Sequence, residues 1–428
     1  MNFIIQDINH LKKIGLVNKI TVIIFCLIPV FLIIGTGVSE LAIIVLSFKF
    51  LIDLIFFKKL KIHNKFLLYF LFIIYGALII NLIFSVNYEN SFLRNIFFIK
   101  YLIFTIGTID FFSKRKLELF FIFKIWTFIL FIFSLDLIIQ FITQKNIIGI
   151  ESPLKGHRYS GFMGDELKAG SLILFFCFII TGFLIKEKKY AVLGAILICF
   201  FISVIFITGD RSNFFKSLLT FFILIFFIDK KIVSKSIILF LTTIGIILFI
   251  ISTNDVFEER YKNRILNELS DNDYNIFNYI KKTEYGKIYS SAYNLYLQKK
   301  IFGVGNKNFR ILCEKDFKKK YPFTKNLKEV KCNTHPHQIY LEILVEHGIF
   351  GMTIFLISLI FYIYKNFLFV LKKRDYLLTS LFFTTLIIFI PVLPGGSFFT
   401  SFNANIFWLN LGFFYSYKNL CSQNKINN

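Results

Sequence analysis

Two histidines stand one residue apart in NTHPHQIYLEILVEHGIFG, the stretch from Asn333 to Gly351. His335 and His337 are two of only six histidines in 428 residues, and an apolar run with helical character follows them directly. Imidazole changes its charge near neutral pH, and it is also a common metal ligand. The pair therefore marks a candidate site for general-base or metal chemistry.

Three interpretations of His335 and His337 are open on these residues alone. As a metal site, His-x-His supplies two ligands at strand-like spacing. The third ligand would come from His157, Asp316 or Glu342. The second interpretation is that the histidines are merely tolerated in a loop near the membrane interface. In the third, a histidine in the first turn of a helix starting near Gln338 is kept neutral by the helix dipole and accepts a proton from a hydroxyl group.

Arginines on the same predicted side of the membrane form a second set of candidate residues. A guanidinium group can bind two phosphate oxygens at once, whereas an arginine at the hydrocarbon edge often only reaches lipid headgroups. Arg158 lies in HRYSGFMGDE and Arg211 lies in TGDRSNF. The other external arginines are Arg94, Arg260, Arg264 and Arg310. A ring of arginines on one face would suit a diphosphate headgroup held at the membrane surface.

The elements that must position these residues are membrane helices. The chain is 56% hydrophobic and 19% aromatic, with a formal net charge of +23. Apolar runs of about 18 or more residues recur, which is the length that crosses roughly 30 Å of hydrocarbon. The predicted fold class is therefore all-α, a polytopic integral membrane protein with about twelve transmembrane helices. The expected spans are 20–37, 41–57, 66–86, 95–112, 119–143, 167–185, 190–208, 213–228, 236–252, 338–364, 376–392 and 403–417.

Lysine clusters in every second connection predict the orientation of these spans. Cytoplasmic loops carry the excess of Lys and Arg, and the clusters lie at residues 12–19, 58–65, 114–116, 186–189, 230–235 and 365–374. Both termini are therefore expected in the cytoplasm. The chain divides into an N-terminal bundle of about nine helices (1–252), one long external loop (253–337) and about three C-terminal helices (338–428). Lysines placed between apolar runs also argue against a nucleic-acid partner, which would require one basic face.

Two further pairs of residues are placed to hold the external side together. Cys313 and Cys332 lie in the long loop, where an oxidising compartment permits a disulfide just ahead of the histidines; two unpaired thiols are the alternative. Asp136 and Gln140 lie on one face of a predicted span. A carboxylate facing lipid is costly, so this pair is expected to face the interior, where it anchors an external loop or lines an acceptor path.

The spacing after the histidines resembles a motif of the bacterial O-antigen ligases, in which a His is followed by Asn, Ser or Gln, a nine-residue spacer and Gly-x-x-Gly. His337, Gln338, Gly348 and Gly351 match this pattern. The segments DLIIQFITQKNIIGI, RYSGFMGDE, TGDRS and IFGVGNKNF precede it in the order expected for the shared O-antigen ligase and polymerase superfamily. The resemblance covers patches between residues 135 and 359.

This resemblance implies a metal-independent, inverting glycosyltransferase of the GT-C membrane type, without a cofactor, in the bacterial inner membrane with its long loop in the periplasm. It implies a glycan donor on undecaprenyl diphosphate, and lipid A core or a lipid-linked glycan as acceptor, among membrane lipids. His337 becomes the catalytic base, and Arg158 and Arg211 become the first diphosphate contacts. The remaining candidate substrate contacts are Arg94, Arg310, His335 and Gln338.

The resemblance leaves ligase and polymerase both open. Some polymerases carry paired arginine segments with a fixed spacing to glycine, and Gly170 stands one residue off that spacing from Arg158. This departure favours a ligase without excluding a polymerase.

Two other classes of protein compete with a glycan transferase. A transporter or flippase shares the layout of about twelve spans, but it would show repeated halves, helices interrupted by Gly or Pro, and charges at the membrane midplane. The chain has only six prolines and no convincing repeat. A non-catalytic scaffold would leave the ordered His and Arg segments without a reason. Glycan transfer is therefore the expected function.

Overall fold

The computed structural model describes residues 13–57, 65–154, 156–227, 230–263, 267, 270, 282–319 and 331–423. Within these ranges the chain is helical, with one isolated antiparallel bridge between Lys145 and Glu151 and no strand, which confirms the all-α class. The helices before the long loop are α2 (Leu16–Ile34), α3 (Thr36–Phe57), α4 (Lys65–Ile83), α5 (Tyr88–Ile96), α6 (Ile99–Phe112), α7 (Lys116–Thr143), α8 (Ala169–Lys186), α9 (Ala191–Ile207), α10 (Arg211–Ile225) and α11 (Lys230–Thr253). The later helices are α12 (Asp255–Glu258), α15 (Glu284–Gln298), α16 (Phe309–Lys319), α17 (Ile339–Lys373), α18 (Tyr376–Leu386) and α19 (Ser401–Gln423).

Each of the twelve expected spans coincides with a helix, and the apolar helices make this a multi-pass membrane protein. By length and composition, 6 helices of the described residues can cross a membrane, or up to 7 if the bent pair Ile237–Thr253 and Asp255–Asn263 is one span. The 6 are Leu16–Ile34, Tyr88–Phe112, Lys116–Thr143, Ala169–Lys186, Lys188–Ile207 and Ile339–Lys373. The number of spans supported by the helices is thus lower than the expected twelve.

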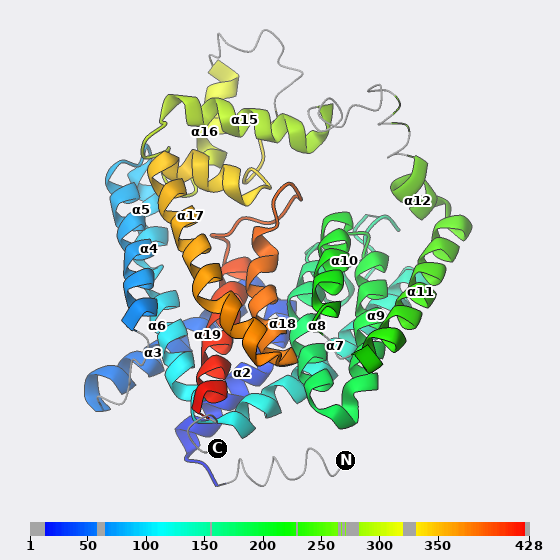
Figure 1. Cartoon of the computed structure of the whole chain (residues 1–428). Coiled ribbons are helices and arrows are strands. Elements are labelled where there is room, and N and C mark those ends of the chain that lie inside the picture. Colours follow the sequence, from blue (N-terminus) through cyan, green and yellow to red (C-terminus); the bar gives the residue numbers. More distant parts are fainter. Residues whose placement is uncertain are drawn as a thin grey trace.

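The long loop and the end of α19 lie at opposite ends of the molecule (Figure 1). We call the end with α15 and α16 the loop face and the other end the terminus face. On the loop face, α15 packs on α17 and α16 around a small core of its own. The core residues are Ile288, Ala292, Leu295, Val304, Phe309, Cys313 and Val345. In the segment EYGKIYSSAYNLYLQKK, the helical spacing of Tyr285, Ile288, Ala292, Leu295 and Tyr296 predicts an amphipathic helix, and the structure forms it as α15.

A break at Gly348 divides α17. The backbone of Gly348 is not helical, with φ 66° and ψ −169°. The first part of α17 lies below α15, and the second part descends through the bundle (Figure 1). The sequence prediction of one continuous span over 338–364 therefore missed this break: the nine residues after Gln338 form a short separate stretch of helix on the loop face.

The break is held open by the segment that contains IFGVGNKNF. Val304 N donates to the Val345 carbonyl (2.9 Å), and Ile349 N donates to the Lys300 carbonyl (2.8 Å). A Cβ on Gly348 would lie 2.3 Å from the carbonyl oxygen of Ile301, so only glycine permits this approach. We call residues 300–309 and 345–350 together the interlock. It gives partners to the backbone groups that the broken helix leaves free.

Asn81 of α4 fixes the interlock to the bundle. Its side-chain NH2 donates to the carbonyls of Phe302 (3.0 Å) and Glu346 (2.8 Å), and its side-chain oxygen accepts from Asn306 N (3.1 Å). Asn306 in turn donates to the Asn95 side chain of α5 at 2.7 Å. Two segments far apart in the sequence are thus held against the same pair of helices.

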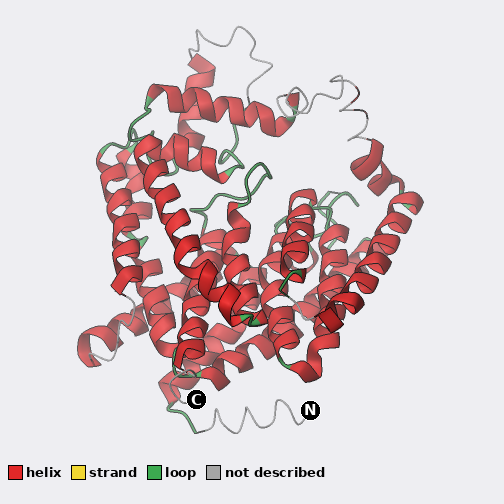
Figure 2. Cartoon of the chain, in the orientation of Figure 1, coloured by secondary structure: helices red, strands yellow, loops and turns green. Residues whose placement is uncertain are grey.

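A loop of residues 390–400 crosses the middle of the molecule between α18 and α19 (Figure 2). It has the sequence IPVLPGGSFFT, whose prolines and glycines do not favour regular structure. We call it the central loop. Its backbone and side chains contact both the histidine segment and α10, as described below.

Candidate functional site

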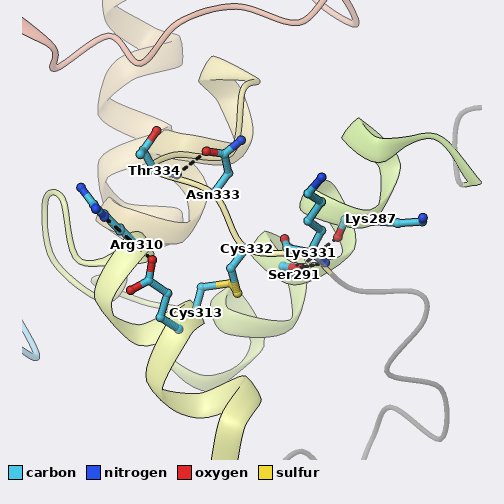
Figure 3. Close-up of a disulfide and its surroundings, with 9 residues drawn as sticks. Lys287, Ser291, Arg310, Cys313, Lys331, Cys332, Asn333 and Thr334 are labelled. Carbon is cyan, nitrogen blue, oxygen red and sulfur yellow. Dashed lines mark hydrogen bonds and ion pairs between the residues drawn. A yellow bond between two sulfur atoms is a disulfide. The ribbon is translucent and has the colours of Figure 1, made fainter.

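A disulfide between Cys313 and Cys332 joins α16 to the chain just ahead of the histidines (Figure 3). The two Cα atoms are 5.6 Å apart. The next residue back, Lys331, exchanges two hydrogen bonds with the Ser291 hydroxyl of α15, at 2.8 and 3.2 Å. Of the two alternatives that the sequence leaves open, the structure forms the disulfide, and this bond fixes the start of the histidine segment to two helices of the loop face.

The side chain of His337 is oriented by Asn333. Thr334 N donates to Asn333 Oδ1 (2.7 Å), so the amide nitrogen Nδ2 faces His337 Nε2 at 3.0 Å. An amide nitrogen only donates, and therefore Nε2 accepts and the ring proton is assigned to Nδ1. The ring of Tyr285 packs edge-on against the imidazole, with 5.5 Å between centroids. The lone pair of Nε2 is thus available as a base once Asn333 is displaced.

Burial keeps the two imidazole rings neutral. Burial lowers the pKa of His337 to about 4, and the charge of neighbouring His335 acts in the same direction. Burial together with the positive charge of Lys307 lowers the pKa of His335 to about 4. The expectation of a neutral ring agrees with these values, but the dominant cause is burial instead of the helix dipole.

His337 precedes the helix instead of lying in its first turn. Gln338 is the N-cap of α17, and its side chain accepts from Leu341 N at 2.7 Å. His337 has a left-handed backbone with φ 57°, and its carbonyl accepts from Gly395 N at 2.8 Å. The placement of His337 in the first turn was wrong, because the cap uses the next residue. The side chain of Gln338, a candidate substrate contact, thus caps the start of the helix.

His335 lies against His337, with 4.0 Å between ring centroids. Its Nδ1 is 2.9 Å from the Thr334 hydroxyl, and its Nε2 is buried with no hydrogen-bond partner in the part of the chain that the structure describes. An unpaired buried nitrogen is costly, and it fits a hydroxyl group of a bound ligand. The structure thus gives His335 a position beside the base candidate.

A buried ion pair adjoins His335. Lys307 Nζ lies 3.5 Å from Glu342 Oε1, and both groups bond to the hydroxyl of Ser397 in the central loop. The other carboxylate oxygen of Glu342 accepts from Phe398 N at 2.9 Å. Glu342, one candidate third metal ligand, is therefore committed to holding the central loop.

The other residues of the metal interpretation do not gather with the histidine pair. His157 is exposed, and the side chain of Asp316 lies outside the described residues. Across the parts of the chain that the structure describes, no three His, Cys, Asp or Glu side chains form a group that could hold a metal ion. The donor set around the histidines is instead hydroxyl, amide and ammonium groups.

Three arginines gather at the turn between α9 and α10. Arg158 Nη2 forms an ion pair with Asp210 Oδ2 at 3.0 Å. Arg211 Nη1 donates to the Arg260 carbonyl (3.3 Å), and Arg260 Nη2 donates to the Gly209 carbonyl (2.7 Å). The Nε groups of Arg158 and Arg260 are buried and have no hydrogen-bond partner among the residues that the structure describes. The structure therefore unites the predicted pair Arg158 and Arg211, adds Arg260, and gives the three cations one carboxylate. We call these four residues the arginine cluster.

Asp136 and Gln140 hold the segment that carries Arg158. Asp136 Oδ1 accepts from Ile147 N at 3.0 Å. Gln140 Oε1 accepts from Ser160 N (3.0 Å) and from Gly161 N (2.8 Å). Of the two expected roles, these bonds match the anchoring of an external loop. They fix the backbone two residues beyond Arg158.

The central loop connects the arginine cluster to the histidines. Ser212, which follows Arg211, donates its hydroxyl hydrogen to the Pro394 carbonyl. The next residue, Gly395, donates its N–H to the His337 carbonyl at 2.8 Å. A single peptide unit of the central loop thus bonds to His337 and to the residue after Arg211, so the loop links the two sets of candidate residues.

The two remaining arginine candidates lie apart from this cluster. Arg310 is on α16, with its Nε 3.9 Å from Glu314 and its side chain 61% exposed (Figure 3). Arg94 lines a separate cavity beside α3 and α6. Arg264 lies outside the described residues. The expected ring of arginines is therefore a compact group of three with Arg94 at a second place.

Lys216 and Lys307 are site residues that sequence reasoning missed. Lys216 Nζ donates to the Pro394 carbonyl at 3.0 Å, and its side chain is buried. A lysine inside the expected span 213–228 was an available signal, because charged residues within spans usually have a role. Lys307 carried no comparable signal, since only the fold brings it to His335.

The helices and the site define a multi-pass membrane protein with a histidine and an arginine cluster at one end of its bundle. Residues 167–356 match the family model described as O-antigen ligase. The chain therefore carries a domain of the O-antigen ligase and polymerase superfamily, and the matched residues include Arg211, the interlock and His337. The search of curated proteins finds no match. The family implies a membrane glycosyltransferase that acts on lipid-linked glycans.

Proposed function

We propose that this protein transfers a glycan from undecaprenyl diphosphate to an acceptor hydroxyl group at the outer face of the bacterial inner membrane, as an O-antigen ligase does. The reaction would be inverting and metal-independent. The observation that carries this proposal is the central loop, which bonds to the His337 backbone through Gly395 and to the residue after Arg211 through Pro394. A base and a group of cations with surplus charge share one site.

In this proposal His337 activates the acceptor. The acceptor hydroxyl replaces the Asn333 amide at Nε2 and gives its proton to that nitrogen as its oxygen attacks the anomeric carbon. The new bond forms on the face opposite the diphosphate, so the bond from the anomeric carbon to the diphosphate oxygen breaks with inversion. His335, whose Nε2 has no hydrogen-bond partner among the described residues, binds a sugar hydroxyl group beside it.

The arginine cluster stabilises the leaving group. Negative charge grows on the diphosphate as its bond to the sugar breaks, and fixed guanidinium groups compensate this charge without reorganising. Arg158, Arg211 and Arg260 supply three positive charges, whereas Asp210 removes one. A bound diphosphate also raises the pKa of the nearby His337 from about 4 towards the range in which a base works well at neutral pH.

The membrane arrangement in this proposal has twelve spans of the GT-C type. The three parts are the bundle 1–252, the periplasmic loop 253–337 and the helices 338–428. The lysine clusters in every second connection support a cytoplasmic position for both termini, since cytoplasmic loops carry the excess of positive charge. The acceptor is lipid A core or a second lipid-linked glycan, held near the surrounding membrane lipids.

The His337→Ala substitution tests the base. Base catalysis contributes about 10²- to 10⁴-fold, so this variant should lose glycan transfer to that extent and still bind the lipid donor. Transfer and donor binding are measured on full-length protein in lipid nanodiscs. The matched control is His157→Ala, whose side chain is exposed on the same face. Full transfer by folded His337→Ala would refute the base, and equal losses in the two variants would favour a metal site.

The banding pattern of lipopolysaccharide in a deletion strain separates ligase from polymerase. Loss of a ligase leaves free lipid-linked polymer, whereas loss of a polymerase leaves lipopolysaccharide capped with a single repeat. Free polymer supports the ligase assignment, and single capped repeats replace it with the polymerase.

A further inference from the structure

A second polar cavity lies beside α3, α5 and α6. Its volume is about 640 Å³, within the range of small-molecule sites. Its polar lining comes from Glu40, Ser47, Arg94, Lys100, Tyr101, Asn306 and Ser401. None of these residues belongs to the arginine cluster, so the cavity is distinct from the proposed donor site.

Among the described residues that line it, the cavity has two cations, Arg94 and Lys100, and one carboxylate, Glu40. Lys100 Nζ forms an ion pair with Glu40, and the Ser401 hydroxyl bonds to the same carboxylate. Arg94 is exposed to the cavity and forms no hydrogen bond or ion pair with another residue of the described ranges. Both Lys100 and Arg94 act electrostatically on the single carboxylate of Glu40, so this lining carries one positive charge in excess. A guanidinium group in a cavity with surplus positive charge fits a phosphate group of a ligand.

The rest of the cavity wall suits a lipid. Five of the lining side chains are apolar and exposed: Ile44 (44%), Phe48 (63%), Leu93 (59%), Phe97 (59%) and Ile99 (41%). Adjacent exposed apolar groups on a membrane protein contact lipid chains or an apolar ligand. A cation at one place and apolar side chains around it together fit an amphiphile with an anionic head.

The cavity and the arginine cluster are connected to the histidine pair through different residues. Asn306 lines the cavity, and the next residue, Lys307, acts electrostatically on His335. Phe399 also lines the cavity, and it lies two residues from Ser397, which bonds to Lys307. The central loop therefore has the cavity at its C-terminal half and the arginine cluster at its N-terminal half.

From this arrangement we propose that the Arg94 cavity binds the phosphate-bearing headgroup of the acceptor lipid, while the arginine cluster binds the donor diphosphate. The role of the bound lipid as an acceptor rests on the proposed glycan transfer, whereas lipid binding in the cavity does not depend on that reaction. The shared ligand chemistry is a phosphate group on a membrane lipid. Its source is either a second undecaprenyl diphosphate glycan or a phosphorylated lipid A core.

The test measures lipid binding to the full-length protein in phosphatidylcholine nanodiscs. The two probes are undecaprenyl diphosphate and lipid A, each titrated separately. Loss of a charge-assisted contact should weaken binding at the cavity about 10- to 100-fold in Arg94→Gln, and Arg94→Lys should lose less. Arg211→Gln should weaken only undecaprenyl diphosphate. The matched control is Arg374→Gln, an exposed arginine after α17 on the terminus face, which should change neither probe.

The two probes separate the sources of the phosphate group. If wild-type protein binds two undecaprenyl diphosphates and Arg94→Gln binds one, the acceptor is a lipid-linked glycan. If Arg94→Gln weakens lipid A alone, the acceptor is a lipid A core; both results support the site. Unchanged affinity of folded Arg94→Gln for both probes would overturn it. Retained donor binding in Arg211→Gln would count against the proposed donor site and leave the Arg94 result standing.

Discussion

The two ends of the molecule use their positive charges differently. On the terminus face, Lys186 bonds to the Tyr417 hydroxyl and lies 3.5 Å from Asp375. Lys418 donates to the Asn366 side chain and Lys373 donates to the Cys421 carbonyl, both at 2.7 Å. These lysines are paired with groups of the protein itself, and they join α8, α17 and α19.

On the loop face, positive charge exceeds what the protein compensates. In the arginine cluster, three guanidinium groups share the carboxylate of Asp210. Arg94 forms no hydrogen bond or ion pair with a residue of the described ranges. Buried charges are normally paired, so a surplus held in place indicates a ligand that brings negative charge. The comparison teaches that lysines at one end complete the fold, while the surplus positive charge of the arginines at the other end supports the proposed binding of an anionic substrate.

The largest expected effect breaks this comparison by removing one charge from each end. Arg211→Gln should lower kcat about 10²- to 10³-fold, because it removes a donor from the leaving group. Lys418→Gln should leave kcat near that of the wild type, since its partner Asn366 belongs to the fold. Both are measured as glycan transfer in nanodiscs. Equal losses would show that both ends act through structure alone.

Chemical reduction should also affect one end only. The disulfide closes a segment with a sequence separation of 19 residues, and opening it should destabilise the loop face by about 3 kcal/mol. The Cys313→Ser variant should show faster proteolysis between α15 and α17, and a reductant should have no added effect on it. Cys421→Ser, at the terminus face, is the control. Resistance of Cys313→Ser to protease would contradict the role of the bridge.

A methyl group added at Gly348 should disturb the loop face by a smaller amount. The positive φ of 66° and the 2.3 Å approach of Ile301 O disfavour any side chain. Gly348→Ala should lower the free energy of unfolding by about 1–3 kcal/mol. Gly76→Ala in α4, where nothing lies within 4 Å of the added Cβ, should be neutral or slightly stabilising. Thermal unfolding of the two variants makes the measurement, and equal melting temperatures would count against the interlock.

The pH dependence should come from the loop-face histidines and be the mildest effect. The pKa of His337 is lowered from 6.5 to about 4, so kcat/KM should be flat above pH 5 and fall as the pH drops through about 4. The acidic limb of the kcat profile should lie at higher pH than that of kcat/KM, because bound diphosphate raises the pKa of His337. A kcat/KM limb at 6.5 would show that the ring is not buried in the free protein.

The same histidines link stability to pH. His335 and His337 bind protons more tightly in the unfolded chain than in the fold, with pKa values of 6.5 against about 4. The contribution of these histidines to the free energy of unfolding is therefore fully present above pH 6.5 and decreases as the pH falls from 6.5 to about 4. The double variant His335→Ala, His337→Ala should lose this part of the pH dependence of unfolding.

Local patterns predicted the parts of this molecule that depend on local physics. Apolar runs placed all the main helices, and helical spacing identified α15. The His337 motif, the disulfide and the pairing of Arg158 with Arg211 were also accessible, since each requires only residue type and side of the membrane. The break at Gly348 was missed because its cause, the approach of Ile301, lies 47 positions away in the sequence.

The rest of the site depends on contacts between distant segments. Arg260 stood among the external arginines, but nothing in its neighbourhood tied it to Arg211 instead of to lipid headgroups. The neutral state of His337 was predicted from the helix dipole, whereas burial by Tyr285 and its surroundings dominates. Burial of an external loop residue cannot be obtained from composition, because it requires knowing what packs above it.

The contacts of Asn81 constrain when the site can form during synthesis of the chain. The Asn81 amide bonds to Glu346 O, which is made 265 residues later. A growing chain that has inserted α4 therefore lacks the Glu346 partner of this amide until α17 is made. The interlock, and with it the position of His337, forms only after that point, so a chain truncated before α17 contains many membrane helices but no complete site.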